Sequence, residues 1–167
     1  GGDSASGAYI ANLIVDGAGL TSSAGFTAAF LSRFYRCTAK NCTNHGFNVS
    51  LSGVTMTWCD ATGCATNPAF RAGHGLCCVA WSNTSTGFGS ALDSSWTRCL
   101  SVNNSGASSD GFSQGTGVSI RLVECTAYGN GRDGMRFNAF STGVEARAEA
   151  CLSYANTGTN FKASGAY

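Results

Sequence analysis

Charged residues are scarce in this chain, and it contains a single proline. Lys, Arg, Asp and Glu make up 11% of its 167 residues, whereas about a quarter is usual for a folded domain. Ten basic residues face nine acidic ones without forming a basic run, which argues against nucleic acid as a partner. Apolar runs fall short of the roughly 18 to 20 residues needed to span a membrane. We therefore expect no nucleic-acid partner and no membrane insertion.

Sequence signatures of several enzyme classes are missing as well. The chain has no P-loop and no HExxH segment, and only His45 and His74 are available to join cysteines around a zinc ion. The cysteine spacings follow a long repeat and not the short pairs of a zinc site. We expect no bound cofactor, with Ca²⁺ held by carboxylates as the one alternative.

Glycine and small polar residues take the place of the missing charges. Gly accounts for 23 residues, hydrophobic residues for 43%, and there are nine cysteines. This composition is poor in helix formers and rich in turn residues, yet apolar enough to bury a core. The length suits one domain, which we place at residues 8–167 after a linker or disordered lead-in at residues 1–7. Since no polar cap closes the repeat described next, we expect a segment of a longer chain.

A repeat of 19 to 26 residues runs through the sequence, and six cysteines mark it. The anchors are Cys37, Cys59, Cys78, Cys99, Cys125 and Cys151. Five residues beyond each anchor stand Cys42, Cys64, Asn83, Asn104, Asn130 and Asn156. Ten to thirteen residues beyond stand Phe47, Phe70, Phe88, Phe112, Met135 and Phe161, each preceded by Gly, Ala or Asn. Columns aligned over six segments indicate a repeat architecture.

The short alternating runs inside each repeat predict strands. Residues 47–51 and 118–122 alternate apolar and polar side chains and are too short for helices. Like residues at equal positions predict rungs that stack in register, about 4.8 Å apart. The Cys, Phe and Asn columns should then point inward, with the Asn amides hydrogen-bonded along the axis. We expect the Gly before each Phe to supply a turn with positive φ.

These rungs resemble those of the pectate-lyase-like superfamily. The likeness is clearest in residues 124–135, Glu-Cys-Thr-Ala-Tyr-Gly-Asn-Gly-Arg-Asp-Gly-Met, and it extends over residues 30–164. The resemblance implies an all-β fold, a right-handed, single-stranded parallel β-helix of about six to seven rungs. The superfamily includes polysaccharide lyases, polygalacturonases, alginate epimerases and phage tailspikes, so the likeness implies a polysaccharide partner without fixing an activity.

The catalytic motifs of that superfamily do not carry over. Alginate epimerases contain Tyr-Gly-Phe-Asp-Pro-His, whereas residues 44–48 here are Asn-His-Gly-Phe-Asn, without the Tyr, the Asp or the Pro. Neither the acidic calcium cluster of pectate lyases nor the Asp and His-Gly set of polygalacturonases is recognisable. An activity therefore has to be argued from outward-facing columns.

Two cysteines stand apart from the anchor column. Cys42 and Cys64 occupy the asparagine column in adjacent rungs, so their Cα atoms should lie within disulfide range. A disulfide would need an oxidising compartment. The alternative is that both act, like the anchors, as small apolar residues.

The first candidate column holds Asp110 and Asp133, each just before a Gly, with Arg136 close by. Stacked carboxylates of this kind could bind Ca²⁺ or act as an acid/base pair on a glycosidic bond, which makes Asp110, Asp133 and Arg136 the candidate catalytic residues. The alternative is ordinary Asp-Gly turn chemistry.

Two further columns are candidate binding surfaces. The second column follows the Phe ladder and consists of Asn48, Arg71, Gly89, Ser113, Arg136 and Lys162. Its cations could hold the carboxylates of an acidic sugar or simply be solvated. The third column consists of Lys40, Thr62, Trp81, Val102, Tyr128 and Tyr154. Its rings could stack on pyranose faces, pack against another subunit or cover a turn.

Together these features favour an extracellular or virion β-helix module that recognises surface polysaccharide, like a phage tailspike or fibre. We expect such a module to form a homotrimer or part of a larger assembly, in a virion tail or on a cell surface. One alternative is a lyase, hydrolase or epimerase acting on acidic glycans through the Asp column. The other is a structural spacer that binds nothing.

Overall fold

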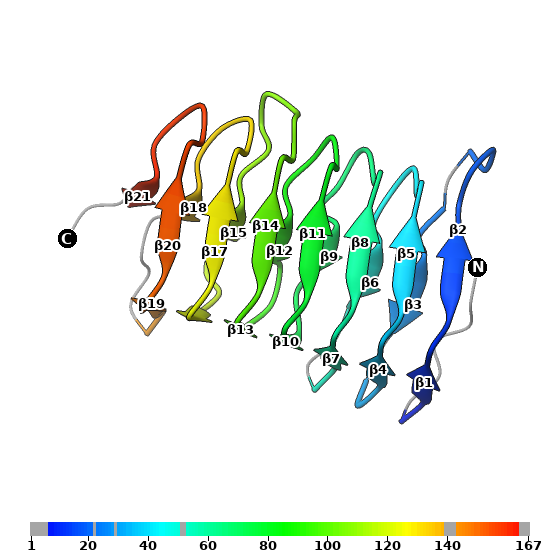
Figure 1. The fold of residues 1–167 in the computed structure, drawn as a ribbon. Coiled ribbons are helices and arrows are strands. Elements are labelled where there is room, and N and C mark those ends of the chain that lie inside the picture. The colour runs from blue at the N-terminus through cyan, green and yellow to red at the C-terminus, as the bar shows by residue number, and fades with distance from the viewer. Residues whose placement is uncertain (1–6, 22, 29, 51–52, 139–142, 164–167) are drawn as a thin grey trace.

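The computed structural model describes residues 7–21, 23–28, 30–50, 53–138 and 143–163. They form a parallel β-solenoid with three strands in each rung and seven strands in each of three sheets. Followed from the N-terminus to the C-terminus, the coil is right-handed (Figure 1). Every regular element among the described residues is a strand. The predicted parallel β-helix is thus confirmed.

Sheet A contains the first strand of each rung: β1 (Tyr9–Ala11), β4 (Arg33–Tyr35), β7 (Thr55–Thr57), β10 (His74–Leu76), β13 (Ser94–Thr97), β16 (Ile120–Val123) and β19 (Ala146–Glu149). Sheet B contains the second: β2 (Ile14–Asp16), β5 (Thr38–Lys40), β8 (Asp60–Thr62), β11 (Val79–Trp81), β14 (Leu100–Val102), β17 (Thr126–Tyr128) and β20 (Leu152–Tyr154). Sheet B forms the row of arrows nearest the viewer in Figure 1.

Sheet C contains the third strand of each rung and closes the coil. Its members are β3 (Phe26–Ala28), β6 (Phe47–Val49), β9 (Phe70–Arg71), β12 (Phe88–Ser90), β15 (Phe112–Gln114), β18 (Met135–Phe137) and β21 (Phe161–Ala163). Each strand pairs in parallel with its counterparts in the neighbouring rungs. The register aligns equivalent residues, as in Phe70↔Phe88 and Phe88↔Phe112.

Two sharp corners on either side of sheet B rest on single residues in the left-handed backbone region. The corner before sheet B uses Arg36, Trp58, Cys77, Arg98, Glu124 and Ala150, and the corner after it uses Asn41, Gly63, Ser82, Asn103, Gly129 and Ala155. Their φ values lie between 50° and 65°. Such conformations cost a non-Gly residue free energy in isolation. Here the paired strands on both sides hold the corner in place.

The glycines that precede the Phe column have a different role from the one expected. Gly46, Gly87, Gly111 and Gly134 are not among the positive-φ residues, so the predicted turn role is wrong. A Cβ on Gly111 would lie 2.4 Å from the carbonyl oxygen of Gly134 and 2.8 Å from Cβ of Ala127. Glycine stands there because neighbouring rungs leave no room for a methyl group.

Aromatic rings stack through the interior. Successive rings of Phe26, Phe47, Phe70, Phe88 and Phe112 have centroids 4.7 to 4.8 Å apart and interplanar angles of at most 12°. The indole of Trp96 lies between 4.9 and 6.1 Å from two of them. It fills the space left by Gly75, whose missing Cβ would lie 2.4 Å from the indole. The in-register stack makes the core a continuous column.

The asparagine column forms the predicted amide ladder. Asn83, Asn104 and Asn130 are completely buried. Each donates from Nδ2 to Oδ1 of the Asn in the next rung, at 2.8 to 2.9 Å, and Asn156 accepts the last bond. The accepting oxygens also accept backbone N–H groups, for example from Asn83 to Asn104 at 3.1 Å, and Oδ1 of Asn83 accepts the backbone N–H of Cys64 at 2.8 Å. Each amide therefore satisfies buried donors in two rungs.

The anchor cysteines form a second interior column of free thiols. Four of their Sγ atoms donate to a carbonyl group of the preceding rung, as from Cys125 to Trp96 at 3.2 Å. On the outside, three ion pairs join rungs, Lys40–Asp16 at 3.1 Å, Arg98–Glu124 at 2.6 Å and Arg121–Glu149 at 3.4 Å. These exposed pairs contribute little to stability, because solvent screens them.

We expect Asn104→Ala to destabilise the fold, because it removes one link of the amide ladder. Asn104 accepts the backbone N–H and Nδ2 of Asn83 and donates to Asn130. Stranding these buried groups should lower the free energy of unfolding by about 3 kcal/mol. Urea denaturation measures the loss. The exposed Ser105→Ala is the control and should stay within about 0.5 kcal/mol of the parent. Equal stabilities of the two variants would contradict a structural ladder.

Candidate functional site

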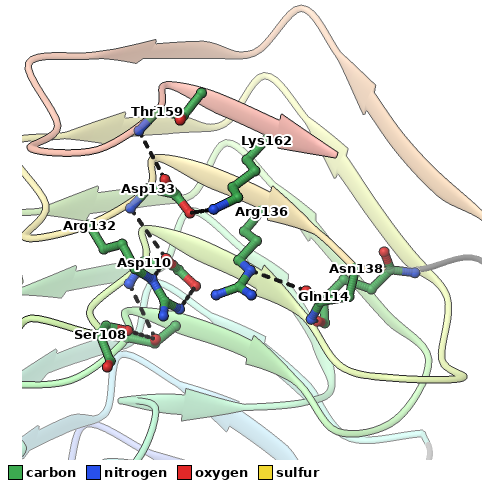
Figure 2. A network of polar contacts seen from close by, with 10 residues as sticks. Ser108, Asp110, Gln114, Arg132, Asp133, Arg136, Asn138, Thr159 and Lys162 are labelled. Carbon is green, nitrogen blue, oxygen red and sulfur yellow. Dashed lines mark hydrogen bonds and ion pairs between the residues drawn. The ribbon is translucent and has the colours of Figure 1, made fainter. Parts of the chain in front are cut away.

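The aspartate column lies where the chain enters sheet C (Figure 2). Its carboxylates are buried. The Asp110 side chain is 0% exposed and accepts two bonds from Arg132, at 2.7 and 2.5 Å. Oδ1 of Asp110 also accepts the backbone N–H of Asp133 at 3.3 Å. Asp133 repeats the pattern by accepting the N–H of Thr159 at 2.9 Å. The column thus links one rung to the next.

This geometry brings the two carboxyl groups together but keeps them from solvent. Asp133 is 3% exposed, and its Oδ2 lies 3.6 Å from Nζ of Lys162. Arg132 and Lys162 supply one positive charge for each carboxylate. A catalytic acid or nucleophile has to reach the glycosidic oxygen or the anomeric carbon. The contacts of Asp110 and Asp133 instead resemble those of side chains that cap backbone N–H groups.

Arg136, which was predicted near this column, lies apart from the aspartates, and Lys162 of the second column approaches them instead. Lys162 turns toward Asp133, while Arg136 donates from Nε to Oδ1 of Asn138 at 3.1 Å (Figure 2). Arg136 keeps its place in the second column, since Ser113 pairs with Arg136 and Arg136 with Lys162. Arg136 therefore belongs with the outer face of sheet C and is not engaged by the aspartates.

A groove of about 640 Å³ lies over the outer face of sheet C. The second column provides its floor, because Asn48, Arg71, Gly89 and Ser113 follow one another in register across β6, β9, β12 and β15. Gly89 has no side chain of its own, and the Pro68 ring packs against it. The remaining lining comes from the ends of these strands and the turns beside them: Asn44, His45, Asn67, Pro68, Thr86, Ser90, Ala91, Gln114, Gly115, Thr116 and Asn138.

The lining is cationic and rich in amides. Arg71 uses Nη1 to donate to Oδ1 of Asn48 at 3.1 Å, and a guanidinium has five N–H donors in all. Asn44, Asn67 and Asn138 add further amide groups, of which Asn67 donates to Asn44 at 2.6 Å. Within the described part of the chain, the lining contains no Asp or Glu. The groove therefore suits a ligand that is anionic and rich in hydroxyl groups.

Two buried polar atoms border this groove without a partner in the described structure. They are Oγ of Ser90 and Oε1 of Gln114, both from lining residues. Gln114 does donate from Nε2 to the carbonyl oxygen of Val118 at 2.7 Å. Both side chains share the inward face of their strands with the Phe column. Buried polar groups normally have a hydrogen-bond partner, so these two atoms indicate a place for an interior water and not for a ligand in the groove.

His45 closes one end of the groove as a neutral side chain. It is buried and its Nδ1 lies 2.8 Å from the carbonyl oxygen of Pro68. A carbonyl oxygen can only accept, so the proton sits on Nδ1. Burial lowers the pKa of His45 below the usual 6.5, and the nearby Arg71 lowers it further. At neutral pH the groove thus owes its positive charge to arginine.

One spacing that the sequence prediction overlooked also falls in this groove. Residues 111–115 read Gly-Phe-Ser-Gln-Gly, which matches the G-x-S-x-G spacing of a hydrolase nucleophile elbow. In such enzymes the Ser occupies a sharp strand-to-helix turn. Ser113 instead lies in the middle of β15 on the outer face of a parallel sheet. The spacing follows from the rung pattern and gives no reason to assign a nucleophile.

The remaining predicted residues lie elsewhere on the solenoid. Trp81, Tyr128 and Tyr154 stand on the outer face of sheet B, on β11, β17 and β20. Cys42 and Cys64 are buried free thiols in adjacent rungs, and burial raises the pKa of Cys64 to about 12. Their disulfide stays a prediction for an oxidising medium.

No protein-family model matches this chain, and comparisons with curated proteins and with solved structures return no match either. The described residues include no helix that is long and apolar enough to cross a membrane. They also contain no group of three or more His, Cys, Asp or Glu side chains placed to hold a metal ion. The fold and the site define a parallel β-solenoid with a cationic groove that lacks carboxylates.

We expect Asp110→Asn to act on stability, because Arg132 would lose the charge that it pairs with in a buried setting. The asparagine oxygen can still accept the N–H of Asp133, so the loss should be about 2 kcal/mol, below that of removing a fully buried ion-pair partner. Thermal unfolding measures it. Asp60→Asn, on the outer face of β8, is the matched control and should change little. An unaltered unfolding curve for Asp110→Asn would argue against a structural role.

We expect the fold to lose stability as the pH falls from about 7 toward 5, because His45 is neutral in the folded state. Its folded pKa lies below the usual 6.5, so the unfolded chain takes up a proton first, and stability rises with pH across that interval. Urea unfolding at several pH values tests this. His45→Gln should flatten the profile between pH 7 and 5. Identical profiles for the parent and this variant would refute the assignment.

Proposed function

We propose that this chain is a polysaccharide-recognition module that binds an acidic glycan in the groove over sheet C. The observation that carries the proposal is the composition of the lining. Arg71, a set of asparagine amides and the hydroxyls of Ser113 and Thr116 face one cavity without a carboxylate among the described residues. An arginine fork suits a sugar carboxylate, and amides suit its hydroxyl groups.

The direction of the groove favours a polymer over a small ligand. Its floor crosses four rungs along the solenoid axis, from β6 to β15. The same column continues to Arg136. Three strand spacings separate Arg71 from Arg136, roughly 14 Å. An acidic chain laid along the axis would meet one guanidinium at Arg71 and the other at Arg136, and between them it would pass Gly89, against which the Pro68 ring packs.

The contacts of the aspartate column favour binding over hydrolysis. Hydrolysis of a glycosidic bond generally uses two carboxyl groups that flank it. Asp110 and Asp133 are buried and engaged by Arg132, by Lys162 and by backbone N–H groups. They are also not among the lining residues of the groove. Enzymes that act on acidic glycans therefore remain the less favoured alternative.

The proposal extends to the setting of the protein. A β-solenoid with few charges and an exterior rich in Ser, Thr and Asn resembles the receptor-binding part of a tailspike or surface fibre. We propose an extracellular or virion-tail location and a homotrimeric or larger assembly. The resemblance to pectate-lyase-like β-helices supports this proposal through the rung pattern. Sedimentation of the 167-residue chain would distinguish a trimer from a monomer.

We expect Arg71→Ala to weaken binding of acidic oligosaccharides by about 10- to 100-fold, the range of a lost charge-assisted hydrogen bond. Calorimetric titration with uronate oligosaccharides of four to eight residues measures the change. Carboxyl-reduced versions of the same oligosaccharides should bind the parent and Arg71→Ala alike. Raising the salt concentration should weaken binding to the parent and have a smaller effect on the variant.

Arg98→Ala is the matched control, since Arg98 is exposed beside sheet B and pairs with Glu124. It should bind uronates as the parent does. Three results would contradict the proposal: no uronate binding by the parent, an equal loss of uronate affinity in Arg71→Ala and Arg98→Ala, or tighter binding of the carboxyl-reduced sugars. Release of new reducing ends or unsaturated uronates would instead indicate the enzymatic alternative.

A further inference from the structure

A second surface of different chemistry lies on the outer face of sheet B. In the first three strands, the outward positions include Asp16, Lys40 and Asp60. In the last four, β11, β14, β17 and β20, none of the outward positions is charged. They are Val79, Trp81, Leu100, Val102, Thr126, Tyr128, Leu152 and Tyr154. We name these eight residues the aromatic strip.

The large side chains of the strip are open to solvent. Trp81 is 47% exposed, Tyr128 38% and Tyr154 45%. The rings of Tyr128 and Tyr154 are neighbours, with centroids 4.8 Å apart and planes tilted by 40°. Leu152 adds an aliphatic side chain that is also exposed. The core needs none of these groups, because the inward positions of the same strands are filled by Ala80, Ser101, Ala127 and Ser153.

The size of the strip argues against a protein partner. A three-residue strand is about 10 Å long, and four strands 4.8 Å apart cover about 19 Å, so the strip is roughly 200 Å² in area. A stable protein interface needs about 800 Å² on each side. A flat, narrow and uncharged strip instead matches a single extended sugar chain lying along the solenoid axis.

The spacing of the rings fits such a chain. Trp81 is paired with Val102, and Val102 with Tyr128, in one outward column. The two aromatic residues are therefore two rungs apart, roughly 10 Å. A ribbon-like chain of equatorially linked glucose advances by nearly one rung spacing per sugar. Its first and third sugars would then lie over Trp81 and Tyr128, each presenting the apolar face of a pyranose ring to an aromatic ring.

We propose that the aromatic strip binds an uncharged, ribbon-like glucan by stacking sugar rings on Trp81 and Tyr128, with Tyr154 as a further platform. This site is separate from the groove over sheet C, because it lies on another sheet and contains no cation to hold a carboxylate. The two sites would take different sugars, or different parts of one branched polymer.

Calorimetry and tryptophan fluorescence with cellohexaose test the proposal on the 167-residue chain. The parent should bind, with an emission change from Trp81. Trp81→Ala and Tyr128→Ala should each weaken binding about tenfold or more, a larger loss than the pairwise aromatic interaction alone because stacking area is removed as well. Thr62→Ala is the matched control, since Thr62 occupies the same column on β8. It should bind as the parent does, as should Trp58→Phe at the adjacent corner.

Circular dichroism and unfolding curves separate a binding defect from misfolding, and both strip variants should fold because the replaced side chains are exposed. Absence of cellohexaose binding by the folded parent would overturn the proposal. So would equal affinity in Trp81→Ala, or a parent that dimerises through the strip and loses dimerisation in that variant. Uronate binding by the groove variant Arg71→Ala is measured separately, so failure of one site leaves the other testable.

Discussion

The whole molecule depends on equivalent backbone groups of successive rungs being hydrogen-bonded in register. Each of the three sheets is a ladder of parallel strands in which every residue meets its counterpart one rung away. Because the strands are only two to four residues long, no rung could hold this register by itself. The interior columns supply the missing specificity, since a slip by one residue would turn an inward column to the outside.

Different residues in the interior columns satisfy the buried backbone donors at different points along the axis. From Asn83 to Asn156 an amide ladder satisfies backbone donors at the corner after sheet B. In the two rungs before it, Cys42 and Cys64 replace the amide. The ladder ends where Cys64 donates its backbone N–H to Asn83. On the other side of the coil, Asp110 and Asp133 perform the corresponding task for the chain entering sheet C. The polar residues in these columns therefore help to hold neighbouring rungs together.

With the interior committed to stacking, recognition is left to the outward positions, and the solenoid presents them as separate faces. Sheet C offers a recessed surface with arginine and amide groups, because turns from neighbouring rungs stand beside its outward column. Sheet B offers a flat surface whose last four strands have no outward charge. A repeat architecture can vary these faces independently, since exchanging an outward side chain leaves the ladder beneath it intact. Two faces with unlike chemistry are therefore compatible with one core.

Much of the fold could be predicted from the sequence because stacking imposes its own repetition. The Cys, Phe and Asn columns repeat since each position meets its own kind one rung away, and that regularity is visible without coordinates. The glycine column shows the limit of the approach. A turn with positive φ and a lack of space both select glycine, and only the packing of Gly111 against Gly134 and Ala127 separates these two causes.

The candidate sites were less predictable, for a related reason. The sequence placed Asp110 and Asp133 in one column but gave no sign that Arg132 and backbone N–H groups would occupy them. It placed Arg71 in an outward column, but the groove also needs Asn44, Asn67 and Asn138, which come from turns of unequal length. The sequence alone determined the rung repeat and the identity of its columns. Rungs that stack in register need like residues at equivalent positions, so the same residue types recur along the chain at regular spacing. Only the tertiary structure decided which polar side chains are buried and which line a cavity. The turns that meet at the groove come from different rungs, and their residues do not follow the repeat.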